Sequence, residues 1–378
     1  MSSSQNATGR IALVLQGGGA RGAYHVGAIK ALAEIAGPGR SPFQIICGAS
    51  VGAINASAVA VASTDFRAGA EHLEELWRGL DSSAIFDTRA LPLIATGARW
   101  AMTPVLGPFG VRTTGGILDY APLDRLLRRE FSQARLRHAI TSGALHAICI
   151  TATSYTEGIS VTFFQGIDEI ADWERARRRG ARVALGPQHL LASAALPFAF
   201  DPVRLDGGFF GDGALRLSSP LSPAIHTGAD RILVITTRDG IPDRPDTPKA
   251  SPSLGAMAGH ALDILFNDNL EADYERLTRI NQTVSLLSPE ARGQTPLKEV
   301  EALMLRPSED VRTIAKALSA DLPRVLRVMV RGLGGAEGDG QIESYMMFEP
   351  AYIARLIDLG HADTMAREAE IRGFFGLG

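Results

Sequence analysis

Short apolar runs alternate with segments of helical periodicity through the first 240 residues of the chain. The apolar runs predict the strands of one sheet, and they span residues 11–15, 43–47, 147–152, 159–164 and 231–236. Helical spacing of apolar residues fills the intervals at residues 23–35, 51–62, 66–80, 119–131, 188–195 and 222–228. A strand, a helix and a further strand in succession are typical of right-handed crossovers in a parallel sheet. We therefore expect an α/β fold with a central, mostly parallel sheet flanked by helices.

The pattern changes after the run at 231–236, which we take as the last strand of the sheet. Prolines among polar residues predict a linker there, and helical periodicity then dominates, starting with one long helix over 258–280 and including a strand-like run at 300–305. The parts expected from this change are a flexible polar tail, an α/β domain, a linker and a mainly helical C-terminal extension, over residues 1–10, 11–238, 239–253 and 254–378.

Charge and composition narrow the class of protein. The formal net charge is −3, which gives no sign of the basic surface of a nucleic-acid-binding protein. The two cysteines, Cys47 and Cys149, lie in apolar runs, so neither a disulfide framework nor a metal site is expected. No apolar stretch is long enough to span a membrane, and the polar start lacks the apolar core of a signal peptide. These features predict a cytoplasmic protein.

One serine stands in a tight glycine turn between a predicted strand and a predicted helix. The sequence Gly48-Ala49-Ser50-Val51-Gly52 follows the apolar run 43–47 directly. In a nucleophile elbow of this kind, the strained turn exposes the serine hydroxyl at the edge of the sheet, beside the unpaired N–H groups of a helix N-terminus. A serine is a weak nucleophile until a base takes its proton. The pattern therefore predicts Ser50 as a nucleophile that needs a partner.

A second glycine turn, Gly17-Gly18-Gly19-Ala20-Arg21-Gly22, follows the first predicted strand. Residues without side chains let successive N–H groups converge on a small anion, as an oxyanion hole requires. The alternative is a dinucleotide fingerprint in an NAD-binding oxidoreductase, which needs an acidic residue at the end of the second strand. The turn around Ser50 occupies that place, which favours the oxyanion hole.

The base has several candidates. The chain has eight histidines, none in a glycine turn of the kind that presents a catalytic group. Asp206 and Asp212 share one glycine-rich loop, and a carboxylate beside Ser50 can act as general base if burial raises its pKa. Asp206-Gly207 has the composition of a plain turn, so Asp212 is the stronger candidate. A classical triad through His260 or His361 is the alternative.

Four motifs in this order resemble the patatin-like phospholipase family. They are Gly-Gly-Gly-Ala-Arg-Gly at 17–22, Gly-Ala-Ser-Val-Gly at 48–52, Ala-Ser-Ala-Ala-Leu-Pro-Phe at 192–198 and Asp-Gly-Ala at 212–214. The resemblance implies a three-layer patatin-like α/β fold and hydrolysis of lipid acyl esters through an acyl-enzyme. It also implies a Ser–Asp dyad without histidine, and neither a metal nor an organic cofactor.

The resemblance assigns roles to individual residues. Ser50 is the implied nucleophile, between the elbow glycines Gly48 and Gly52, and Asp212 is the implied base. The implied oxyanion site consists of the N–H groups of Gly17, Gly18 and Gly19. Arg21 either orients this loop or approaches a headgroup phosphate.

The expected partners are a lipid or other acyl-ester substrate and, peripherally, a membrane surface. The apolar stretch at about 81–116 fits a packed excursion from the core or, alternatively, a lid that contacts the acyl chain. A catalytically inactive lipid-binding protein of the same fold is the alternative function. Acyl chain length, headgroup preference and oligomeric state are left open by the sequence.

Overall fold

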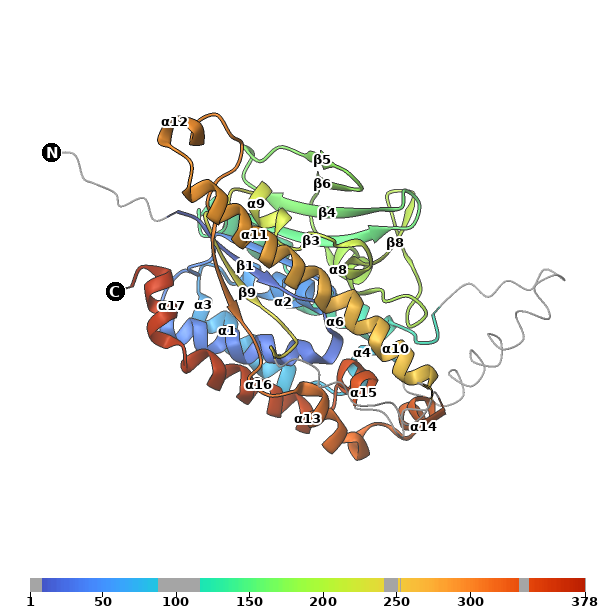
Figure 1. The fold of residues 1–378 in the computed structure, drawn as a ribbon. Helices are drawn as coiled ribbons and strands as arrows, with labels where there is room; N and C mark the ends of the chain where they lie inside the picture. The colour runs from blue at the N-terminus through green and yellow to red at the C-terminus, as the bar shows by residue number, and fades with distance from the viewer. Residues whose placement is uncertain (1–8, 88–115, 241–250, 252, 333–339, 378) are drawn as a thin grey trace.

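A ten-stranded sheet runs through the molecule, with helices packed against it (Figure 1). The computed structural model describes residues 9–87, 116–240, 251, 253–332 and 340–377. Within them, the strand order is β10-β9-β1-β2-β3-β4-β6-β5, and β8 pairs with β3 and carries β7. The strands are β1 (Ile11–Leu15), β2 (Ile45–Ala49), β3 (Ala147–Ser154), β4 (Ile159–Gly166), β5 (Trp173–Arg175), β6 (Arg178–Arg182), β7 (Val203–Leu205), β8 (Gly208–Asp212), β9 (Arg231–Ile235) and β10 (Glu301–Leu305).

The half of the sheet from β10 to β3 is parallel throughout. β4 and β8 pair with β3 in the antiparallel direction, and β6 is again parallel to β4. The carboxyl ends of β1 and β2 therefore meet at one edge, which is where open α/β sheets bind their ligands. The expected α/β fold with a mostly parallel sheet is confirmed.

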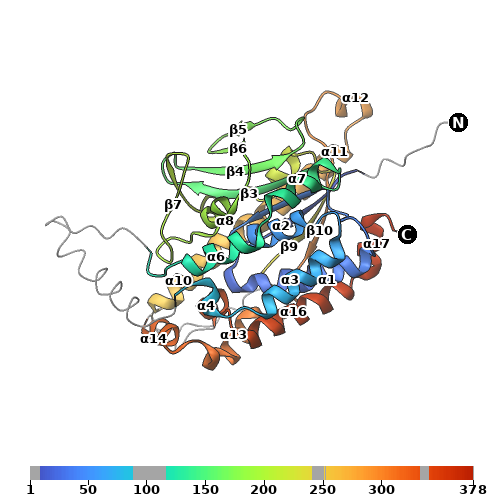
Figure 2. The same cartoon turned by 180° about the vertical axis from the view of Figure 1, so that it is seen from behind.

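Side chains of β1 alternate between two cores, as the two-residue period of a strand requires. Leu13 and Leu15 face the core formed with α1 (Ala23–Ala36), α2 (Val51–Val61) and α16 (Pro350–Met365). Ala12 and Val14 face the second core, formed with α9 (Ser222–His226) and α11 (Asn269–Ser285). Seen from the back in Figure 2, α1, α3 and α16 lie together along one side. Helices thus cover both faces and complete three layers.

The C-terminal part of the chain is built into this sheet. β10 pairs in parallel with β9, so the prediction that the run at 231–236 is the last strand is wrong. α16 crosses α1 closely, because Gly27 faces the carbonyl of Ile357 and Gly360 faces that of Tyr24. A Cβ at Gly27 would lie 1.8 Å from the Ile357 oxygen. The expected linker at 239–253 lies mainly outside the described residues.

The remaining helices surround the sheet and its carboxyl edge. The helix expected over 258–280 is interrupted by a π-helical turn, Ile264–Asp268, between α10 (Leu254–Asp263) and α11. The other α-helices are α3 (Phe66–Arg78), α4 (Ser82–Ile85), α6 (Ala121–Glu130), α7 (Gln133–Thr141), α8 (Pro187–Ala194), α12 (Pro289–Arg292), α13 (Val311–Ala317), α14 (Arg324–Gly332), α15 (Gln341–Met346) and α17 (Glu368–Phe375). Most of the 81–116 stretch lies outside the described ranges. Among the helices that the structure describes, none has the length and apolar character to cross a membrane.

Candidate active site

Ser50 has the backbone geometry of a nucleophile elbow. It joins β2 to α2 with φ 56° and ψ −132°, a strained conformation for a residue with a side chain. A Cβ at Gly48 would lie 2.3 Å from the Gly52 oxygen, and one at Gly52 would lie 2.2 Å from the Leu15 oxygen. Close backbone approach therefore requires glycine on both sides of the serine, as the elbow pattern predicts.

A second serine fixes the elbow from α8. The Ser50 N–H donates to Ser193 Oγ at 3.0 Å, and the Ser193 hydroxyl donates to the Thr151 carbonyl at 2.6 Å. The N–H of Ser50 is therefore occupied and does not face an oxyanion. Sequence reasoning used the motif at 192–198 for the family resemblance but gave Ser193 no role of its own.

Asp212 ends β8 beside the elbow and is held by its own backbone surroundings. Its N–H donates to the Ala195 carbonyl at 2.8 Å, and its Oδ1 accepts the Ala214 N–H at 2.9 Å. A Cβ at Gly213 would lie 2.1 Å from the Thr151 oxygen, so the turn after Asp212 has room only for glycine. The Asp-Gly-Ala motif thus fixes the carboxylate against the sheet.

The electrostatic surroundings of Asp212 favour a protonated carboxyl. Burial raises its pKa from 3.8 to about 7, against a smaller lowering by the Ser50 hydroxyl and the Ala214 N–H. Its other oxygen, Oδ2, is buried and has no partner of regular hydrogen-bond geometry among the described residues. The Ser50 hydroxyl therefore lies close enough to lower the pKa of this carboxyl without forming a hydrogen bond of regular geometry.

Asp206 lies apart from this site, in the turn of the β7–β8 hairpin. Asp206 and Gly207 have φ values of 46° and 82°, as the two-residue hairpin turn of Asp-Gly sequences requires. Asp206 is exposed, which confirms the prediction of a plain turn. Asp212, in contrast, lines the same pocket as Ser50.

The histidine alternative receives no support. All eight histidines lie in described ranges, and none of them lines the pocket of Ser50. His361 pairs with Glu34 at 2.9 Å, and His260 is exposed on α10. The structure therefore brings neither candidate histidine to the serine.

The glycine loop lies beside Ser50 and offers free N–H groups. A Cβ at Gly17 would lie 3.2 Å from Ser50 Cβ, and one at Gly19 would lie 2.3 Å from the Tyr345 oxygen. Gly18 and Gly19 have φ values of 152° and 56°. Within the described part of the chain, the N–H groups of Gly17 and Gly18 have no acceptor. Unpaired donors beside a nucleophile are what an oxyanion hole needs.

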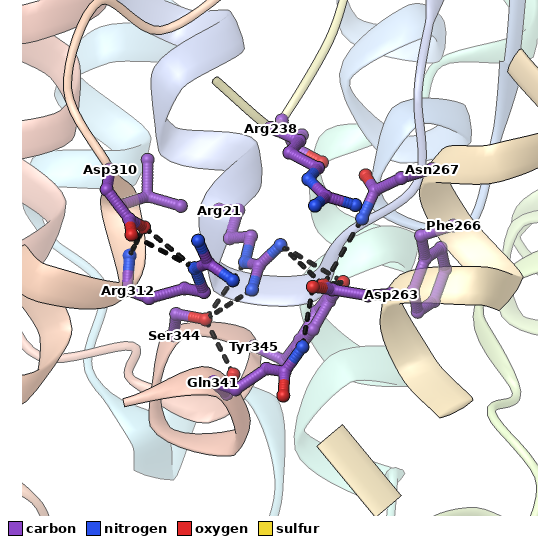
Figure 3. Close-up of polar contacts among 12 residues, drawn as sticks. Arg21, Arg238, Asp263, Phe266, Asn267, Asp310, Arg312, Gln341, Ser344 and Tyr345 are labelled. Carbon is purple, nitrogen blue, oxygen red and sulfur yellow. Dashed lines mark hydrogen bonds and ion pairs between the residues drawn. The ribbon is translucent and has the colours of Figure 1, made fainter. Parts of the chain in front are cut away.

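Arg21 follows this loop directly and is buried, and Figure 3 shows its polar contacts. Its Nε and Nη2 donate to Ser344 Oγ at 2.9 and 2.7 Å, and its Nη1 pairs with Asp263 at 3.2 Å. The guanidinium also lies 3.7 Å from the centre of the Tyr345 ring. Of the two expected roles, orientation of the loop fits this geometry. Contact with a headgroup phosphate does not, because the side chain is only 1% exposed.

Asp263 connects Arg21 to the π-helical turn and to α15. Burial by itself raises the pKa of Asp263, but Arg21 and hydrogen bonds from Tyr345 and Gln341 hold it below its usual value. Asn267 donates to the same carboxylate at 3.2 Å. A charged carboxylate therefore faces Arg21 in this interior. Sequence reasoning missed Asp263, Ser344 and Tyr345, since no motif marks them.

An apolar pocket of about 150 Å³ opens at Ser50, and we call it the site pocket. Apart from Ser50, Asp212 and Tyr345, its described lining is apolar or glycine. An enclosed apolar wall with few polar groups is typical of a site that binds an apolar ligand. Prominent lining side chains are Leu76, Trp77, Phe86, Phe200, Phe266 and Phe348.

Comparisons with known proteins found similar solved structures. VipD from Legionella pneumophila is 12% identical, with a TM-score of 0.39, over 96% of this chain and 67% of that one. Human GIVD cytosolic phospholipase A2 in complex with methyl gamma-linolenyl fluorophosphonate is 13% identical, with a TM-score of 0.43. That match covers all of this chain, which spans 60% of the human chain. No curated protein sequence matches.

The family model described as patatin-like phospholipase matches residues 13–225, which is more than half of the chain. This range includes the glycine loop, the elbow and the Asp-Gly-Ala turn. The chain belongs to the patatin-like phospholipase family.

Proposed function

We propose that this protein is a lipolytic acyl-ester hydrolase of the phospholipase A or esterase type, with Ser50 as nucleophile and Asp212 as base. Family membership supports a lipid hydrolase in general. The observation that carries the finer assignment is the buried Asp212 carboxyl, which lines the same apolar pocket as the serine of the elbow. The apolar lining of that pocket supports an acyl chain as the ligand.

In the first half of the reaction, Ser50 Oγ attacks the ester carbonyl carbon and its proton passes to Asp212. Negative charge then develops on the carbonyl oxygen, where the N–H groups of the Gly17–Gly19 loop bind it. Collapse of this intermediate breaks the bond to the alcohol or lysolipid, which leaves with the proton from Asp212. The acyl group is now an ester of Ser50.

In the second half, water attacks the acyl-enzyme and gives a proton to Asp212. A second oxyanion forms in the same place and collapses to release the fatty acid. The proton on Asp212 returns to Ser50 Oγ. The cycle consumes one water for each ester and restores both side chains, so it needs neither a metal nor an organic cofactor.

An aspartate can do this work without histidine because burial changes its basicity. The pKa of Asp212, about 7, is close to the ordinary pKa of an imidazole, about 6.5. The Ala214 N–H holds Oδ1, which leaves Oδ2 to accept the proton of Ser50. A base whose pKa is near the working pH combines a large charged fraction with a strong pull on the proton.

The experiment is covalent labelling by a fluorophosphonate together with turnover of p-nitrophenyl esters and a diacyl phospholipid. The wild type should label and turn over, and Ser50→Ala should do neither. Ser63→Ala is the matched control, because Ser63 lies just beyond α2, is buried, and its hydroxyl donates only to the Val59 carbonyl. Full labelling of Ser50→Ala would contradict the assignment. A wild type that binds lipid without labelling or turnover would favour the inactive lipid-binding alternative.

Peripheral contact with a membrane and a cytoplasmic location remain predictions. The oxidoreductase alternative loses support, since the chain belongs to a hydrolase family and its second strand leads into the elbow.

A further inference from the structure

A second apolar cavity lies directly beyond the site pocket. It measures about 260 Å³ and lies between α2, α3 and α6, and we call it the α3–α6 cavity. Most of its lining is apolar, including Ala58, Val61 and Leu73. Its lining also includes charged and polar groups, among them Asp65 and Arg135, and the side chains of His72 and Glu130, which pair at 3.0 Å between α3 and α6.

Three residues line both hollows, and they form the wall between them. They are Ile54 of α2, Leu76 of α3 and Leu126 of α6. All three are half-buried in spite of their apolar side chains. The two cavities therefore meet at these three side chains, whose rotamers can change.

The two cavities follow one another along α2. Ser50 precedes the first turn of α2, Ile54 follows one turn later, and Ala58 and Val61 lie one and two turns beyond Ile54. At about 1.5 Å per residue, the helix rises roughly 16 Å from Ser50 to Val61. A straight apolar chain whose carbonyl is at Ser50 would follow this face of α2 from the site pocket into the α3–α6 cavity.

We propose that the α3–α6 cavity receives the distal methylenes of a long substrate acyl chain, and that Ile54, Leu76 and Leu126 control its entry. This inference rests on the proposed function of Ser50. The mainly apolar lining matches hydrocarbon, whereas methylenes beside the charged lining groups are disfavoured, because desolvating a charged group costs free energy. The ligand class is therefore a long, unbranched acyl chain, and the wall sets the preference over short esters.

The first test compares p-nitrophenyl palmitate with p-nitrophenyl butyrate. Ala58→Phe fills the α3–α6 cavity without touching the site pocket, since Ala58 lines only the former. Each excluded methylene costs about fourfold in binding, so loss of two or more should lower the palmitate-to-butyrate ratio of kcat/KM at least about tenfold. Ile54→Ala removes part of the wall between the two cavities and should raise the same ratio. Ala351→Phe, on the exposed side of α16 and in neither cavity, is the matched control and should leave the ratio unchanged.

The second test separates this inference from the chemistry. In the Ser50→Ala background, Ala58→Phe should weaken palmitate binding at least about tenfold in calorimetry and change octanoate binding by less than threefold. The inference is overturned if both cavity variants leave the palmitate-to-butyrate ratio and palmitate binding unchanged. It is also overturned if long and short ligands lose affinity equally in a variant whose unfolding midpoint is unaltered. If the binding difference appears and no ester is turned over, the chain-length inference stands and the proposed function fails.

Discussion

The burial of Asp212 predicts that this proposed base lowers the free energy of unfolding of the protein at neutral pH. The rise of its pKa from 3.8 to about 7 corresponds to about 4 kcal/mol, at about 1.4 kcal/mol for each pKa unit. The unfolded chain ionises this carboxyl near pH 4, whereas the folded chain ionises it only near pH 7. The contribution of the protonated Asp212 carboxyl to the free energy of unfolding is therefore fully present below about pH 4. It is lost as the pH rises to about 7, and the free energy does not change further with this group above that pH.

Asp212→Asn removes this loss, because a neutral amide of the same shape needs no ionisation. Its Oδ1 can still accept the Ala214 N–H, and its Nδ2 can donate toward Ser50. We expect the variant to gain stability relative to the wild type as the pH rises. The difference in unfolding free energy, variant minus wild type, should be about 2 to 3 kcal/mol larger at pH 9 than at pH 5. The same variant should lose turnover, since an amide cannot take the proton of Ser50.

The assay is urea unfolding of both proteins at pH 5 and pH 9, together with the pH dependence of kcat/KM for the wild type. The rate should rise with pH and level off above about 7. Asp206→Asn is the control, because Asp206 is exposed in a turn and should change neither the stability difference nor the rate profile. A stability difference that stays the same at both pH values would refute the argument from burial.

Other contacts give further expectations. Gly52→Ala places a Cβ 2.2 Å from the Leu15 oxygen and should cost at least about 1–3 kcal/mol in urea unfolding, whereas Gly373→Ala, with open space around it, should be neutral or slightly stabilising. Equal effects of the two would contradict the packing argument. Ser193→Ala leaves the Ser50 N–H and a buried carbonyl without their partner and should cost about 1–3 kcal/mol and lower kcat; an unaltered kcat would show that the elbow holds without it. Arg21→Lys keeps the charge and loses the forked hydrogen bonds, so kcat should fall about tenfold or more while KM changes little; a change confined to KM would point to substrate contact instead.

The elbow, the glycine loop and the Asp-Gly-Ala turn were predictable because their constraints are local. Gly48 and Gly52 are required by backbone atoms of the elbow and the adjoining strand, and Gly213 by the neighbouring strand. Each leaves a short pattern that can be recognised without knowing the rest of the fold. The two-residue turn at Asp206-Gly207 was readable for the same reason, since Asp-Gly is suited to positive φ.

The partners of Arg21 could not be predicted in this way. Asp263 and Ser344 lie 242 and 323 residues away from it, and nothing in their own surroundings marks them as ligands of a guanidinium. The run at 300–305 showed that a strand forms there but not that it pairs with β9. The π-helical turn was also hidden, because helical periodicity does not reveal one wide turn whose residues bond to Gln16.

The separation of Arg21 and Ser344 along the sequence also sets an order of events during synthesis. At roughly 5–20 residues per second, about 16 to 65 seconds pass between the emergence of the two residues from the ribosome. During that interval the strand, the elbow and the Asp212 turn can already exist, but the buried arginine behind the glycine loop has no partner on α15. A nascent chain therefore contains Ser50 and the proposed base, Asp212, before Arg21 and Ser344 can hold the glycine loop in place. If the loop works as proposed, the ability to cleave esters therefore arises only after α15 has been synthesised and has packed against Arg21.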